Sequence, residues 1–220
     1  MFDCGQKISC VCFDVGKTLV NFSGEHSLSQ KLALTYNVDV RTFRDKTDGF
    51  IYLDLPVDEL AHEMDLVFGH KQEQNVVELI SFHKTRQCLF DDVIITLKAL
   101  HKRNIQIGII SNTYMWSVIS MKDLGLSDYF EHEIYSYQVK CSKPDVKIFK
   151  KAEESFGMPS TKCMYVGDSM MADVAGAKNA GWKAVLLDRE HKTHIFENLM
   201  PDFIIYSLKD IVCIIDQLNG

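Results

Sequence analysis

Short apolar runs alternate with longer amphipathic segments along most of this chain. Five runs carry no charged residue and are rich in β-branched or aromatic side chains: residues 8–13, 105–110, 163–166, 184–187 and 203–206. Runs of this kind are typical of strands that are covered on both faces. They predict a sheet with helices packed against both of its sides.

The segments between these runs have apolar residues at helical spacing. Residues 91–103 begin with acids and end with bases, and residues 144–157 begin with a proline and end on a glycine, as helices often do. Residues 170–181 are rich in small side chains, and residues 207–218 form a last amphipathic pattern. Strands and helices that alternate in this way predict an α/β fold with a doubly wound parallel sheet.

Residues 20–89 interrupt this alternation. They contain three amphipathic helical patterns, at residues 26–37, 56–69 and 72–86, without a clear strand between them. We therefore expect a small helical insertion after the first strand. The predicted domains are an α/β core over residues 1–19 and 90–220 and a helical insertion over residues 20–89.

Composition and charge indicate which partners and which cellular setting to expect. With 46% hydrophobic and 25% charged residues the chain resembles an ordinary soluble globular protein, and its net charge of −6 argues against nucleic acid as a partner. No apolar run approaches the ~20 residues of a membrane-spanning helix, so no membrane partner is expected. The seven cysteines are scattered without a CxxC pair, which favours a reducing, cytoplasmic setting. The oligomeric state, monomer or homodimer, stays open.

Polar residues follow directly on three of the predicted strands. Asp14 follows the first strand, Ser111 follows the strand at 105–110, and Asp168 comes after Gly167 at the end of the strand at 163–166. In an open parallel sheet, ligands bind in the crevice outside the carboxyl ends of the strands. We expect these three side chains to meet in one crevice.

Four stretches, FDVGKTL, GIISN, SKPDVKIF and GDSMMADVAGAKNAG, resemble the four motifs of the haloacid dehalogenase superfamily, in the family's order. The resemblance covers roughly residues 7–19 and 90–206, and the helical insertion is similar to the family's cap domain. It implies a Rossmann-like core with a cap, and Mg²⁺-dependent hydrolysis of a small phosphorylated substrate through an aspartyl phosphate.

The resemblance also implies metal and nucleophile roles. Asp14 would be the nucleophile that takes the phosphoryl group. Asp168 would bind Mg²⁺ together with Asp14 and the backbone carbonyl of Gly16, a set of hard oxygen ligands that suits this ion.

Three further positions would bind the phosphate or offset its charge, and a fourth would orient one of these groups. Ser111 and the amide of Asn112 would hold phosphate oxygens, Lys143 would neutralise negative charge, and Asp173 would orient Lys143 or a metal-bound water. Phosphoryl transfer depends mainly on this kind of positioning and charge stabilisation.

The first motif departs from the family's pattern at two positions. Gly16 stands where the family usually has a second aspartate, which protonates the leaving group and later activates water. General acid–base help of this kind is worth about 10²–10⁴ in rate. Lys17 replaces a residue that is usually glycine. Its side chain either faces solvent on the loop or reaches the phosphate or the leaving oxygen.

Four explanations of the missing aspartate remain open. The substrate has an easy leaving group, or Lys17 or an insertion residue supplies the acid. Alternatively, the protein is a haloacid dehalogenase or a phosphonate-cleaving relative, both of which lack this aspartate. The last explanation is a degenerate member that binds a phosphorylated ligand or a protein without turnover. Asp168 weakens the dehalogenase explanation, because dehalogenases need no metal.

Overall fold

A computed structural model describes residues 7–22, 27–114, 120–192 and 198–220. Its centre is a six-stranded sheet in the order β5-β4-β1-β6-β7-β8, in which every pair of neighbours is parallel. The strands are β1 (Cys10–Phe13), β4 (Gln106–Ser111), β5 (His132–Tyr135), β6 (Cys163–Gly167), β7 (Lys183–Leu187) and β8 (Phe203–Ile205). The predicted α/β class with a doubly wound parallel sheet is confirmed.

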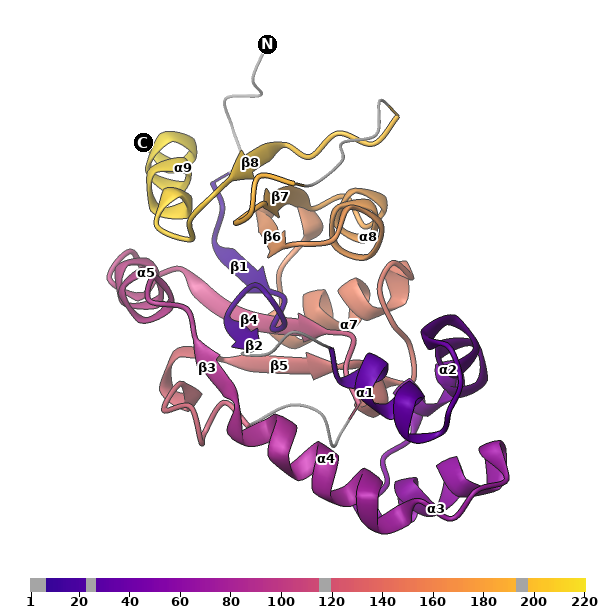
Figure 1. The fold of residues 1–220 in the computed structure, drawn as a ribbon. Helices are drawn as coiled ribbons and strands as arrows, with labels where there is room; N and C mark the ends of the chain where they lie inside the picture. Colours follow the sequence, from indigo (N-terminus) through magenta and orange to yellow (C-terminus); the bar gives the residue numbers. More distant parts are fainter. Residues whose placement is uncertain (1–6, 23–26, 115–119, 193–197) are drawn as a thin grey trace.

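Helices cover the sheet on both faces, as Figure 1 shows. One face carries α5 (Val93–His101) and α9 (Asp210–Asn219), and the other carries α7 (Val146–Phe156) and α8 (Ala175–Asn179). Side chains alternate between the faces along a strand. Phe13 accordingly packs with α5 and α9, whereas Cys12 packs with α7 and α8.

Three buried thiols lie together on the α7 side of the sheet. Cys10 and Cys12 share one face of β1 with their sulfur atoms 3.8 Å apart, and Cys163 is the partner of Cys10 on β6. All three are fully buried. Contact with Cys12, and then burial, raise the pKa of the Cys10 thiol, so this group stays protonated and packs as a small apolar side chain.

The helices of the insertion lie within residues 28–85 and share a hydrophobic core of their own. They are α1 (Leu28–Thr35), α2 (Val40–Thr47), the 3₁₀ helix η1 (Asp48–Tyr52), α3 (Val57–Phe68) and α4 (Glu73–Thr85). The three predicted helices are present. The sequence did not predict α2, because Val40 and Phe43 are its only apolar residues. No helix in the described part of the chain is long and apolar enough to cross a membrane.

Two short strands join the insertion to the core. They are β2 (Val20–Phe22) and β3 (Gln87–Leu89), which pair antiparallel as a separate two-stranded sheet. No strand lies between the three predicted helices in the described residues, but β2 and β3 flank them within residues 20–89 and were not predicted. Three residues each are too few for a periodic pattern. The remaining short elements are η2 (Ser127–Tyr129), α6 (Ser136–Val139) and η3 (Ser160–Lys162).

The predicted helix over residues 170–181 consists of two parts. A π-helical turn, η4 (Met170–Val174), comes first, and α8 follows it. The Ser169 hydroxyl caps this turn by accepting from the amide of Ala172 at 3.1 Å. The wide turn bears on the site below, because Asp173 lies within it.

Candidate active site

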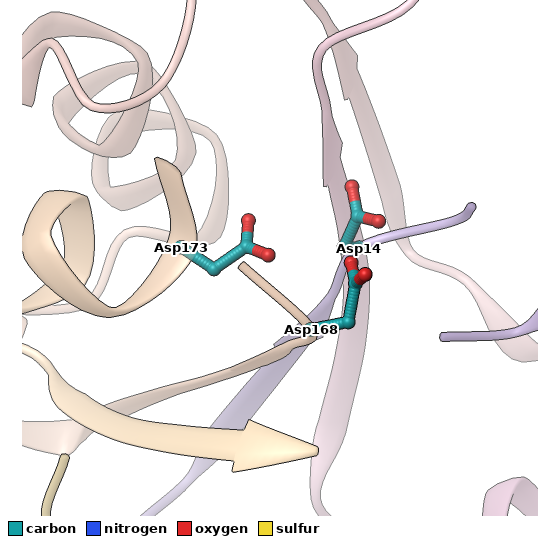
Figure 2. A group of neighbouring side chains, drawn as sticks. All are labelled: Asp14, Asp168 and Asp173. Carbon is teal, nitrogen blue, oxygen red and sulfur yellow. The ribbon is translucent and has the colours of Figure 1, made fainter. Parts of the chain in front are cut away.

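The ends of three neighbouring strands bring the predicted carboxylates together. β1 lies between β4 and β6, and its last residue, Phe13, is paired with both of them. Asp14 and Asp168 each come directly after a strand, and carboxylate oxygens of Asp14, Asp168 and Asp173 lie within 4.8 Å of one another. Figure 2 shows the side chains of Asp168 and Asp173 turned toward Asp14.

Lys143 is bound to three acceptors at the centre of this group. It lies in the loop between α6 and α7 and is only 4% exposed. Its Nζ donates to Asp14 Oδ1 at 2.7 Å, to Asp173 Oδ1 at 2.7 Å and to the Tyr165 hydroxyl at 2.6 Å. An ammonium has three donors, so the protein itself engages all of them. Burial favours the neutral amine, but the two carboxylates outweigh it and raise the pKa of Lys143.

Tyr165 is a member of the site that the sequence analysis missed. Its hydroxyl accepts from Lys143 and donates to the carbonyl of Ile110 at 2.6 Å, which links the ammonium to the end of β4. Burial, followed by the charges of Asp173 and Asp14, raises the pKa of Tyr165 well above its ordinary value, so the phenol stays protonated. A signal was present, because a tyrosine in a fully buried strand needs a partner for its hydroxyl.

Both carboxylate oxygens of Asp173 accept hydrogen bonds, which fix its side chain. Oδ1 accepts from Lys143, and Oδ2 accepts from the amide of Ser169 at 2.9 Å. Its carboxylate occupies the space where a Cβ of residue 167 would lie, so only glycine fits at Gly167. Both oxygens therefore serve to hold the lysine and the loop.

Ser111 and Asn112 follow one another at the end of β4, but their side chains bind different partners. The Ser111 hydroxyl donates to Asp14 Oδ1 at 3.3 Å. The side chain of Asn112 instead pairs with the backbone of Lys143, donating to its carbonyl at 2.8 Å and accepting from its amide at 2.7 Å. The Asn112 side chain thus positions the backbone of Lys143.

The site holds more negative than positive charge. Burial raises the pKa of Asp14, and the nearby Asp173 adds to this, while Lys143 opposes it. Burial, then Asp14 and Asp173, raise the pKa of Asp168 to about 7. No hydrogen bond from the described residues reaches the Asp168 carboxylate. A divalent cation fits this set, because the available donors are carboxylate oxygens with charge still to be neutralised.

Lys17 lies on the rim of the site. It is exposed, and its backbone is in the left-handed region with φ of 59°. Its amide donates to the carbonyl of Val20 at 2.8 Å, which closes the loop after β1. Within the described residues its ammonium forms no ion pair, but its charge offsets part of the rise in the pKa of Asp168. A positive φ explains why glycine is the common residue at this position.

The model of a protein family, described as haloacid dehalogenase-like hydrolase, matches residues 8–181 of this chain. The chain belongs to this family. The resemblance seen in the four motifs is thereby confirmed, and the chain is a haloacid dehalogenase-like hydrolase.

Individual members of the family are similar over almost the whole chain. Glyceraldehyde 3-phosphate phosphatase of Pyrococcus furiosus is 28% identical, with 98% of this chain and 96% of that protein covered. A phosphatase of the family from Thermococcus onnurineus has 24% identity and a TM-score of 0.68, covering 94% of this chain and 97% of that one. A 2-haloacid dehalogenase from Pseudomonas syringae has 23% identity and a TM-score of 0.73, covering 96% and 99%. The two solved structures show a shared fold.

Proposed function

We propose that this haloacid dehalogenase-like hydrolase is a phosphatase that acts on a small phosphorylated metabolite. The observation that carries the proposal is the environment of Asp14. Its carboxylate lies at the end of β1, 2.7 Å from the Lys143 ammonium and beside Asp168. Similarity to the archaeal phosphatase over nearly the whole chain supports the same reaction class.

Asp14 would attack the phosphorus atom and displace the leaving group, which gives an aspartyl phosphate. Water would then release phosphate and restore the free carboxylate. The Ser111 hydroxyl and the backbone amide of Asn112 would hold phosphate oxygens. Lys143 stabilises the charge that develops there, and Asp173 and Tyr165 keep its ammonium in place.

Asp14, Asp168 and the carbonyl of Gly16 would hold Mg²⁺. Bound there, the ion would neutralise charge between the carboxylates and the phosphate. Asp173 is a poorer ligand, because both of its oxygens already accept hydrogen bonds. The oxygen donors fit Mg²⁺ and the site offers no His or Cys side chain among the described residues near Asp14.

The helical insertion would act as the cap, with its boundaries close to residues 20 and 89. It already touches the core through η1: the Tyr52 hydroxyl lies 2.9 Å from the Ser142 hydroxyl, and Lys140 Nζ donates to the carbonyl of Tyr52 at 2.6 Å. These contacts lie next to Lys143 in sequence. The insertion would thereby close over the site and exclude water. A cytoplasmic location stays a prediction from the cysteine pattern.

Gly16 supplies no side chain for general acid catalysis. The proposal therefore favours substrates whose leaving group needs little protonation, such as acyl phosphates. Lys17, which lies next to Gly16 on the same loop, is the alternative source of a proton. A panel of acetyl phosphate, glyceraldehyde 3-phosphate, nucleoside monophosphates and 2-chloropropionate tests this, with Mg²⁺ and with a chelator. We expect phosphate release that needs Mg²⁺ and is fastest with acetyl phosphate.

Asp14→Asn should abolish turnover, and Asp188→Asn is the matched control. Asp188 also follows a strand, β7, but lies outside the carboxylate group. Halide release without metal would instead identify a dehalogenase. Failure to turn over any compound, together with a higher Tm in phosphate, would identify a binding protein.

A further inference from the structure

One arginine joins the two places where the chain passes between the core and the helical insertion. The outgoing strand β2 and the returning strand β3 lie side by side, and the Phe90 amide donates to the Leu19 carbonyl at 3.1 Å directly beneath them. Any movement of the insertion relative to the core must bend the chain at these two crossings. What holds their core-side ends therefore decides where bending occurs.

Arg189 contacts both crossings from a third part of the chain, after β7. Its Nη2 donates to the carbonyl of Thr18, just before the outgoing crossing, at 2.9 Å. The same guanidinium lies 3.9 Å from the ring centre of Phe90, just after the returning crossing. It is also bidentate with Asp92, through Nη1 to Oδ2 and Nη2 to Oδ1, both at 2.9 Å.

Asp92 is in turn fixed to the core. Its Oδ2 also accepts from the Ser207 hydroxyl at 2.8 Å and from the amide of Leu208 at 2.9 Å. The Arg189 and Asp92 side chains are 17% and 10% exposed, so water screens the pair only weakly. A planar guanidinium with two hydrogen bonds to a carboxylate has a defined orientation, which a flexible ammonium does not.

We propose that Arg189 is a positioning residue that fixes both core-side ends of the crossings and confines bending to β2 and β3. Thr18, Phe90 and Asp92 then move as one body with the core while the insertion opens and closes. Thr18 is also part of the loop that carries Gly16 and Lys17. Arg189 thus holds that loop still during cap movement without touching a substrate.

Amide hydrogen exchange tests the proposal independently of any enzymatic activity. Arg189→Lys keeps the charge and loses the bidentate geometry. We expect exchange at Phe90 and in β2 and β3 to rise at least tenfold, while the Ser9 amide, which donates to the Lys162 carbonyl in the core, is unchanged. Asp92→Asn should give the same pattern if the lysine variant folds poorly.

Arg103→Lys is the matched control. Arg103 forms a bidentate pair with Asp216 of α9, at 2.7 Å for both bonds, near the other end of α5 and away from the crossings. It should leave exchange at Phe90 unchanged. Equal effects of both lysine variants at Phe90, or a uniform rise over the whole chain in Arg189→Lys, would overturn the proposal.

A kinetic measurement adds a readout that a purely structural role would not change, and it alone depends on the proposed phosphatase activity. With a looser hinge the closed form is less populated, so the apparent affinity for substrate falls while the chemical step in the closed form is kept. We expect KM to rise about tenfold and kcat to change less than threefold in Arg189→Lys. An unchanged KM would contradict the hinge role even if phosphatase activity is present.

Discussion

The Lys143 ammonium and the Tyr165 hydroxyl lie 2.6 Å apart, and the same hydroxyl donates to the carbonyl of Ile110. Removing this oxygen in Tyr165→Phe leaves one donor of Lys143 and one buried carbonyl without a partner. We expect the free energy of unfolding to fall by about 1–3 kcal/mol and kcat to fall about tenfold, because the ammonium is less well oriented. Chemical denaturation and steady-state kinetics measure the two effects.

Tyr36→Phe is the matched control for this variant. Tyr36 is buried in the insertion and its hydroxyl donates to Asp65 Oδ1 at 2.7 Å, away from Lys143. It should lower stability and leave kcat close to that of the wild type. If the two variants have the same kcat, Tyr165 does not orient the ammonium.

Gly167→Ala should displace Asp173. The added Cβ would occupy the position of the Asp173 carboxylate, and this group cannot move without releasing Lys143 or the Ser169 amide. We expect a loss of roughly 1–3 kcal/mol in the free energy of unfolding and at least a tenfold loss of kcat. At Gly49 a Cβ meets nothing within 4 Å, so Gly49→Ala is the control. Normal activity in Gly167→Ala would show that Asp173 can be repositioned freely.

Asp168 should make the metal-free protein less stable as the pH rises. Burial, Asp14 and Asp173 raise its pKa from the ordinary 3.8 to about 7, so the unfolded chain loses this proton at a lower pH than the folded protein does. Stability therefore falls between about pH 4 and pH 7, by ~4 kcal/mol at most. In Asp168→Asn the loss of Tm between pH 5 and pH 8, measured without metal, should be smaller than in the wild type.

The same variant tests the proposed metal site. Mg²⁺ should raise the Tm of the wild type at pH 8, since a ligand that binds only the folded state stabilises it. The rise should disappear in Asp168→Asn, along with phosphatase activity. A rise of equal size in both proteins would place the ion elsewhere.

Lys17 occupies a backbone conformation that favours glycine, and two substitutions separate its backbone from its charge. Lys17→Gly removes the ammonium and relieves the left-handed strain, whereas Lys17→Ala removes the ammonium alone. We expect Lys17→Gly to be more stable than Lys17→Ala by up to about 1 kcal/mol. If the ammonium reaches the phosphate or the leaving oxygen, both variants should lose about tenfold in kcat. Wild-type kinetics in both would assign Lys17 to the solvent-facing loop surface.

Most of the sheet was predictable, because β1, β4, β6, β7 and β8 are apolar along nearly their whole length. The edge strand β5 was not, since it begins with the polar pair His132-Glu133 and only its last two residues are buried. The strands β2 and β3 have three residues each, and their pairing across the whole insertion leaves no local pattern.

The candidate site divides in a similar way. Asp14, Ser111 and Asp168 follow from strand ends, because chain topology alone places these ends side by side. Arg189 follows from nothing local: its partners Thr18 and Asp92 are 171 and 97 positions away in sequence. The side chain of Asn112 also turned toward Lys143, which depends on loop conformation and not on residue type.

The buried thiols of Cys10, Cys12 and Cys163, on β1 and β6, can be used to measure how often the protein core opens. Cys88 and Cys213 are exposed and should react with an alkylating reagent at once, whereas Cys10, Cys12 and Cys163 can react only after the sheet separates from α7. The rate at which these last three are alkylated therefore reports how often the native core breaks apart. Because these cysteines are native, the rate of core opening can be measured in every variant above without adding a probe.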